Sequence, residues 1–125
     1  MAPHPFRAAV ERGDFDAVVG LLADDVVFRS PAVFKPYEGR ETVATILRTV
    51  GTVFEDFRYT DEMDGEGIHG LVFEARVGDR DVQGIDLIRP AADGRIAELT
   101  VMVRPASALM ALAERMGPAL AAAGV

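Results

Sequence analysis

The sequence predicts an α+β fold in which helices cover one face of a curved, mainly antiparallel sheet. The first half of the chain carries three segments with the apolar spacing of helices, and the second half carries four strand-like segments separated by short turns. This order of helices and strands is typical of the α+β class. A chain of 125 residues suits one domain, over residues 1–125, with a single hydrophobic core.

The first two helices are predicted from apolar spacing and from residues that begin or end helices. One runs from about Pro5 to Glu11 and stops at Gly13, a residue suited to ending a helix. The next begins after Asp14, whose carboxylate is a good N-cap. Its apolar stripe consists of Val18, Leu21 and Leu22.

A strand, a loop and a third helix follow. The segment 23–25 turns the chain into a strand over 26–29, and Pro31 ends this strand because proline cannot donate to a sheet ladder. Residues 32–39 predict an irregular loop. The third helix runs over about 40–54, with an apolar stripe of Val43, Ile46, Leu47 and Val50.

The rest of the chain predicts an antiparallel meander and a last helix. The strands cover about 56–63, 68–77, 80–89 and 95–104, and turns at 64–67, 78–79 and 91–94 join them. The last helix begins near Pro105, since proline suits the first turn of a helix. Its stripe of Leu109, Leu112 and Met116 predicts packing over the open end of the fold or against a second subunit.

The composition excludes several classes of function. With no Cys, the chain has no disulfide, thiolate nucleophile or Cys-bound zinc or iron–sulfur cluster, and two His argue against a His-rich metal site. A net charge of −7 with dispersed Arg residues argues against a nucleic-acid partner. No apolar run approaches the roughly 20 residues of a membrane helix. The first residues lack the pattern of a secretory signal, so we expect a cytoplasmic protein without metal or cofactor.

The hairpins of the meander predict which residues share the inner face of the sheet. If 78–79 is a two-residue turn, Leu71 pairs with Asp86. A second hairpin centred on 92–93 places Asp86 opposite Leu99. The other small or apolar residues of this face are Phe73, Ala75, Val82, Gly84, Ile88, Ala97, Val101 and Val103.

Asp86 is the residue that this pattern singles out. A carboxylate on an apolar face is costly unless it is paired or protonated, so it is either a ligand-facing acid or base or a structural group satisfied by backbone donors, Tyr59 or His69. His69 lies diagonal to Asp86, roughly 7–8 Å away, a separation that long side chains can bridge. It is either the partner of Asp86 or a filler at the strand end. We take Asp86 and His69 as candidate catalytic residues.

The outer face of the meander mixes charged and apolar side chains. Such a surface suits a partly solvated dimer interface better than a core. Its residues are Val72, Glu74, Arg76, Asp81, Gln83, Ile85, Leu87, Glu98, Thr100, Met102 and Arg104.

Four segments of the sequence resemble a known family. They are 13–18 (GDFDAV), 21–28 (LLADDVVF), 37–41 (YEGRE) and 93–96 (DGRI). Together they resemble a SnoaL-like domain of the nuclear transport factor 2 (NTF2-like) superfamily over about residues 6–104. The resemblance implies a cone-shaped α+β barrel with a pocket between the helices and the concave sheet face, and commonly a homodimer formed through the sheet. It implies no single activity, because relatives include isomerases, cyclases, epoxide hydrolases, dehydratases and non-catalytic binding proteins.

The ketosteroid isomerases of this superfamily allow a comparison residue by residue. Their general-base Asp falls on Ser30, and their oxyanion-hole Tyr falls on Phe6. Their second oxyanion donor, an Asp kept protonated by apolar surroundings, falls on Asp86. Because one of the three functional positions is retained, ordinary steroid isomerisation is not expected.

Two functions follow from these observations. One is a homodimer that binds a small, largely apolar molecule, with Asp86 as proton donor or shuttle in a cofactor-free isomerisation, cyclisation or dehydration. The other is a non-catalytic ligand-binding or interaction module, which the loss of the base and the tyrosine favours. An open cavity that reaches Asp86 would favour the enzyme. The candidate ligand-binding residues are Phe6, Phe28, Ser30, Tyr37, Phe57, Tyr59, Phe73, Leu99 and Val101.

Overall fold

A single sheet with helices on one side forms the fold. The structure is a computed structural model that describes residues 3–125. The helices are α1 (Pro5–Glu11), α2 (Phe15–Leu21), α3 (Arg40–Val53) and α4 (Ala106–Ala122). The strands are β1 (Leu22–Arg29), β2 (Tyr37–Glu38), β3 (Glu55–Gly65), β4 (Ile68–Val77), β5 (Arg80–Pro90) and β6 (Ile96–Arg104). The predicted α+β class, with three N-terminal helices, a mainly antiparallel sheet and a C-terminal helix, is confirmed.

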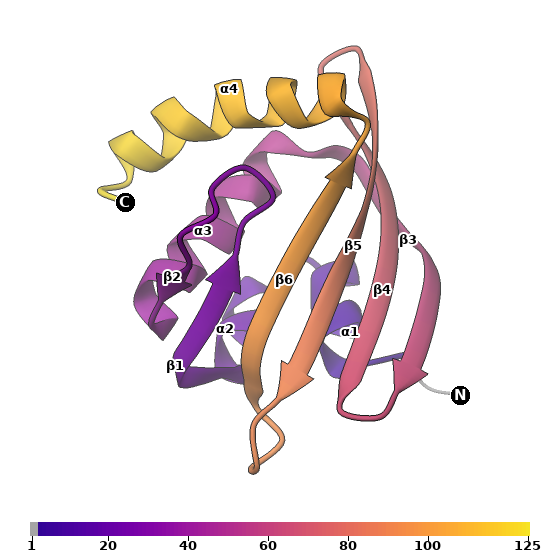
Figure 1. Ribbon diagram of the computed structural model, residues 1–125, viewed down its shortest axis with the longest axis vertical. Coiled ribbons are helices and arrows are strands. Elements are labelled where there is room, and N and C mark those ends of the chain that lie inside the picture. The colour runs from indigo at the N-terminus through magenta and orange to yellow at the C-terminus, as the bar shows by residue number, and fades with distance from the viewer. Residues whose placement is uncertain (1–2) are drawn as a thin grey trace.

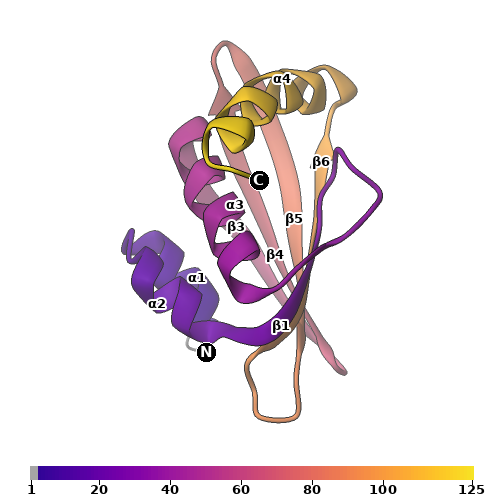
Figure 2. The same cartoon turned by 90° about the vertical axis from the view of Figure 1, so that its left-hand side faces the viewer.

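The strands lie in the order β2-β1-β6-β5-β4-β3, and only the β1–β6 pair is parallel. The sheet curves but does not close, so β2 and β3 remain its two edges (Figure 1). Helices α1, α2 and α3 cover the concave face, and α4 lies across one end of the sheet (Figure 2). None of the helices in residues 3–125 combines the length and the apolar character that crossing a bilayer requires.

Local hydrogen bonds explain where the first helices begin. The Nδ1 atom of His4 accepts from the Phe6 backbone N–H at 3.0 Å, which satisfies one of the free donors at the start of α1. A carboxylate oxygen of Asp14 accepts from Ala17 N–H at 3.1 Å and caps α2, as predicted. Between the two helices, Gly13 adopts φ 69°, a left-handed conformation that glycine allows without strain.

The two hairpins of the meander differ in how well the sequence predicts them. The β4–β5 register is confirmed, with Leu71 opposite Asp86 and a two-residue turn at 78–79. The predicted β5–β6 register is wrong by two residues, because Asp86 pairs with Val101 rather than Leu99. Residues 92–94 lie in the hairpin turn, outside the ladder, and the β5–β6 register is irregular between Arg89 and Pro90. A shift of two residues keeps the side chains of 98–103 on their predicted faces, since side chains alternate with a period of two. Beyond the irregularity the prediction is wrong, because Ile96 rather than Ala97 is buried in the core.

The region around β1 also differs from the prediction. The segment 23–25, predicted as a turn, lies inside β1, at a shift in the β1–β6 register between Leu22 and Val27. Arg40 holds this segment by donating two hydrogen bonds to the Leu22 carbonyl, at 3.1 and 2.8 Å. The predicted loop contains β2, which pairs with β1. A strand of two residues is too short to show an alternating pattern in the sequence.

The core lies between the concave face of the sheet and the four helices. The apolar stripe of α3 faces the sheet, as its spacing predicts, with Val43, Ile46 and Leu47 buried and Val50 half-buried. The largest fully buried side chains are those of Val18, Leu22, Val26, Val43, Leu71, Phe73, Val77, Ile88 and Leu99. Among them Val18, Phe73 and Leu99 border a cavity that the core does not fill.

Candidate functional site

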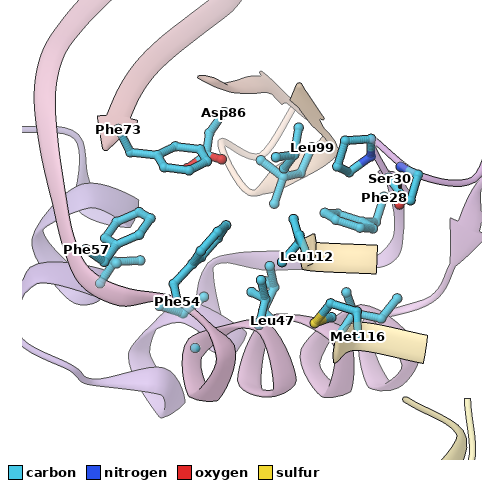
Figure 3. A pocket seen from close by; sticks show the side chains of 18 of the residues that line it. Phe28, Ser30, Leu47, Phe54, Phe57, Phe73, Asp86, Leu99, Leu112 and Met116 are labelled. Atoms are coloured by element: carbon cyan, nitrogen blue, oxygen red, sulfur yellow. Dashed lines mark hydrogen bonds between the residues drawn. The ribbon is translucent and has the colours of Figure 1, made fainter. Parts of the chain in front are cut away.

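A cavity of about 730 Å³ lies between the concave sheet face and the helices. Pockets that hold small organic ligands measure about 300–1,000 Å³, so the cavity has the size of a ligand site. Phe54, Phe57 and Phe73 lie at one end of it, and Ser30 and Met116 lie at the other (Figure 3). The sequence-predicted residues that line it are Phe6, Phe28, Ser30, Tyr37, Phe57, Tyr59, Phe73, Asp86, Leu99 and Val101.

Asp86 projects from β5 into the wall of this cavity. Its side chain is 7% exposed, and it is the sole buried charged or polar residue within residues 3–125. The Tyr59 hydroxyl donates a hydrogen bond to Asp86 Oδ2 at 3.1 Å. Burial raises the pKa of Asp86 to about 7, although the Tyr59 hydrogen bond acts in the opposite direction. Burial, followed by the charge of Asp86, raises the pKa of Tyr59, so the phenol keeps its proton and remains a donor.

Aromatic contacts hold the ring of Tyr59 in place. Phe57 meets Tyr59 edge to face with ring centroids 5.0 Å apart, and it stacks on Phe73, also at 5.0 Å. Phe54 lies 5.7 Å from Phe57 and 5.5 Å from Phe73. The guanidinium of Arg7 lies 5.8 Å from the Tyr59 ring centroid. Rings packed in this way limit the positions that the Tyr59 hydroxyl can take relative to Asp86.

The opposite end of the cavity is formed by β1 and the loop that follows it. Phe28 and Tyr37 come together here, with ring centroids 6.5 Å apart. The Ser30 hydroxyl oxygen accepts a hydrogen bond from Ala32 N–H at 3.1 Å, which is the structural role that a serine at a strand end commonly has. Ser30 therefore lines the cavity while it also stabilises the start of the loop.

His69 does not pair with Asp86. Its Nε2 lies 2.7 Å from Glu62 Oε2, and its Nδ1 lies 3.3 Å from Asp64 Oδ1. The cause is an irregularity in β3 between Tyr59 and Asp61, which turns Glu62 toward the inner face beside His69. A carboxylate 2.7 Å away satisfies the imidazole, and His69 is not among the residues that line the cavity. Of the two roles left open for His69, that of partner to Asp86 is therefore wrong.

The helices supply further lining residues, for which the sequence predicts packing or no particular role. They form the side of the cavity that faces the sheet. Apolar spacing identifies the stripes of α3 and α4 but does not distinguish a stripe that fills the core from one that borders a cavity. These residues include Val10, Phe15, Val18, Ile46, Leu47, Val50, Gly51, Phe54, Leu112, Ala113, Met116, Gly117 and Leu120.

Two other charged residues border the cavity, and both have partners elsewhere. Glu11 pairs with Arg7 at 3.3 Å. Arg58 donates to Glu74 at 2.8 Å and to the Asp56 carbonyl at 3.0 Å. Since Arg58 is already paired, the lining offers an anionic ligand little attraction.

Comparisons with known proteins identify the family. The profile of the SnoaL-like domain family matches residues 5–99. The chain belongs to the SnoaL-like domain family. This confirms the resemblance carried by the four sequence segments. No curated protein matches the chain.

Solved structures of several bacterial proteins are similar to this SnoaL-like domain. A steroid delta-isomerase from Pseudomonas aeruginosa is 47% identical, with a TM-score of 0.89 over 94% of this chain and 88% of that one. An uncharacterized protein with a cystatin-like fold from Silicibacter pomeroyi is 36% identical, with a TM-score of 0.86 over 91% of this chain and 81% of that one. An NTF2-like protein from Mesorhizobium loti, 20% identical, shares the fold with a TM-score of 0.69 over 80% of this chain and 85% of that one.

Proposed function

We propose that this SnoaL-like domain binds a small, largely apolar, uncharged molecule in its cavity and exchanges a proton with it through Asp86. One observation carries the proposal. The hydrogen-bonded Asp86–Tyr59 pair lies in the wall of an open cavity rather than inside a packed core. An apolar side chain at position 86 would avoid the cost of burying a carboxyl group, so a ligand explains the pair better than packing does.

The chemistry follows from the position and the pKa of Asp86. A pKa of about 7 means that the acid and the carboxylate are both populated at neutral pH. The carboxylate takes a proton from a carbon next to a carbonyl group of the ligand and returns it at another carbon, which completes an isomerisation without a cofactor. Tyr59 holds the carboxyl group through its hydrogen bond. Cyclisation or dehydration would use the same proton exchange.

The similarity to a steroid delta-isomerase supports a fused-ring ketone as the first substrate to test. A cavity of about 730 Å³ is large enough for a ring system of this kind. Ser30 and Phe6 stand where ketosteroid isomerases are expected to have their base and tyrosine. In this chain Asp86 and Tyr59 would therefore have to carry the reaction without those groups.

The test combines ligand detection with turnover. Native mass spectrometry of the purified protein is expected to show a bound small molecule. Conversion of a β,γ-unsaturated steroid ketone to its conjugated isomer is followed by ultraviolet absorbance, and we expect Asp86→Asn to abolish it. Asp81→Asn changes an exposed residue of the same strand and is the matched control. Turnover that persists in the Asp86 variant would remove Asp86 from the reaction.

A further variant tests the cavity itself. Ala113 lines the cavity from α4, so Ala113→Phe is expected to fill part of it and to weaken ligand binding while the fold is kept. Circular dichroism checks the fold, and isothermal titration calorimetry measures the affinity. Unchanged affinity in a folded Ala113→Phe variant would place the ligand outside the cavity.

Non-catalytic binding is the second candidate function. Its support is Ser30, which replaces the expected base and whose hydroxyl accepts from Ala32 N–H. A binding protein would retain the ligand unchanged. Nuclear magnetic resonance of the ligand after prolonged incubation separates the two functions, because an enzyme gives new ligand signals and a binding module gives none.

We also propose that two copies pair through the outer face of the sheet. Met63 and Met102 on this face are 48% and 55% exposed, and Phe34 is 99% exposed. Phe34 belongs to the loop between β1 and β2, which projects on the outer side of the sheet (Figure 2). Large exposed apolar side chains of this kind favour association.

The dimer is tested by analytical ultracentrifugation. Met102→Asp is expected to shift the protein from dimer to monomer. Met110→Asp is the matched control, because Met110 is 64% exposed but lies on α4. A monomeric wild-type protein at micromolar concentration would exclude a stable dimer.

A further inference from the structure

Gly84 on β5 lies directly opposite Phe73 on β4. A Cβ atom at position 84 would lie 2.2 Å from Phe73 Cζ and 2.6 Å from Phe73 Cε2. It would also lie 2.8 Å from the Met102 carbonyl oxygen. The phenyl ring therefore occupies the space that any side chain at position 84 would need.

The backbone does not explain this glycine. Gly84 does not have the positive φ that disfavours other residues, so its conformation suits an ordinary strand residue. Gly70 provides a comparison within the same sheet. A Cβ atom there would meet only the ends of flexible side chains, the nearest being Met63 Cε at 3.2 Å. The ring of Phe73, together with the Met102 carbonyl oxygen, is thus the reason for glycine at position 84.

The position of the Phe73 ring determines the shape of the site. The ring stacks on Phe57, and Phe57 packs edge to face on Tyr59. Tyr59 in turn donates to Asp86, which follows Gly84 by two residues on the same face of β5. A ring displaced from Gly84 has to move away from β5 toward the cavity and toward the rings that fix Tyr59.

We propose that Gly84 is a specificity-determining and positioning residue. It receives the Phe73 ring against the sheet, which sets the free width of the cavity beside Asp86 and keeps Tyr59 within hydrogen-bond distance of Asp86. Gly84 thereby limits the size of the ring system that the cavity admits. The ligand part of this inference rests on the proposed function, whereas the steric part does not.

The ligand part is tested with uncharged hydroxyarenes of increasing size: phenol, 2-naphthol and 1-hydroxypyrene. We expect Gly84→Ala to lower the affinity for 1-hydroxypyrene at least tenfold and the affinity for phenol less than threefold. In the double variant Gly84→Ala, Phe73→Leu the affinity for 1-hydroxypyrene is expected to return to within threefold of the wild-type value. Gly70→Ala is the matched control and should bind all three probes as wild type does. Equal weakening of all probes, or no weakening, would overturn the size limit.

The steric part is tested without any ligand by a thermal-denaturation cycle. Phe73→Leu should lower the melting temperature in the wild-type background, because it replaces a buried ring, which is 1% exposed, with a smaller side chain. In the Gly84→Ala background the same change should lower the melting temperature less, since it relieves the clash with the Phe73 ring while the close contact with the Met102 carbonyl oxygen remains. Equal effects of Phe73→Leu in both backgrounds would overturn the contact. If wild-type protein binds none of the probes, the ligand part fails together with the proposed function, and the cycle still decides the steric part.

Discussion

Asp86→Asn tests whether the buried carboxyl group is held in its protonated form. Burial raises the pKa of Asp86 from its ordinary 3.8 to about 7 in the folded protein. Between these values the folded state binds a proton that the unfolded state has released. The stability that this proton provides is therefore complete below pH 3.8 and is lost as the pH rises through about 7. Asn does not titrate, so the variant lacks this pH dependence.

The size of the effect follows from the two pKa values. Each tenfold change in the proton equilibrium is worth about 1.4 kcal/mol. A rise from 3.8 to about 7 therefore corresponds to a loss of about 4 kcal/mol over the whole titration. A measurement at pH 5 and pH 8 covers about two pH units of this window. The difference in unfolding free energy between wild type and Asp86→Asn should then change by about 2–3 kcal/mol.

Urea denaturation of both proteins at the two pH values measures this difference. Comparing wild type with the variant cancels most of the contribution of other titrating groups, such as His4, whose pKa is lowered mainly by burial. We expect the variant to gain stability relative to wild type as the pH rises. A difference that stays constant between pH 5 and pH 8 would show that Asp86 has an ordinary pKa, and the proposed proton exchange would lose its basis.

Three further predictions concern the surroundings of the site. Tyr59→Phe removes the hydrogen bond that stabilises the Asp86 carboxylate, so the pKa of Asp86 should rise above about 7; carbon-13 NMR measures it, and an unchanged value would contradict the contact. The Glu62 carboxylate accepts hydrogen bonds from His4 N–H, Arg7 and His69, and Glu62→Gln weakens them. The substitution should lower the free energy of unfolding by about 2 kcal/mol, measured by urea denaturation at pH 7. Burial raises the pKa of Glu62, but the hydrogen bonds outweigh burial and lower this pKa below 4.5. The loss of stability in the variant should therefore fade as the pH falls below 4.5, where Glu62 of the wild type becomes protonated. Ser30→Ala removes the hydrogen bond from Ala32 N–H and should lower the free energy of unfolding by about 1 kcal/mol, measured by thermal denaturation. The pKa of Asp86 should not change in this variant and serves as the control.

Much of the sheet could be predicted because its signals are local. A two-residue turn at 78–79 determines the β4–β5 register, and alternation then places Phe73 and Asp86 on one face. The β5–β6 register depends on the hairpin around 92–94, whose length and irregularity the residue types do not reveal. The error of two residues changed the partners of Asp86 but not the face on which it lies.

The candidate site could be predicted only on the sheet side. Alternation identifies inward-facing residues such as Leu99 and Val101, which do line the cavity. The partner of His69 could not be predicted, because it depends on an irregularity in β3 that places Glu62 beside the imidazole. The space left open between Leu47 on α3 and the sheet is a result of tertiary packing, and helical periodicity carries no information about it.

Two features that oppose stability occur together at one wall of the fold. The cavity leaves its lining side chains with fewer packing contacts, and Asp86 is a buried carboxyl group. Neighbouring core positions such as Leu71 and Ile88 are buried and do not line the cavity. Unrelated packing defects would be scattered through the core. Their concentration around the carboxyl group of Asp86 is expected if a ligand, rather than stability, has shaped this wall.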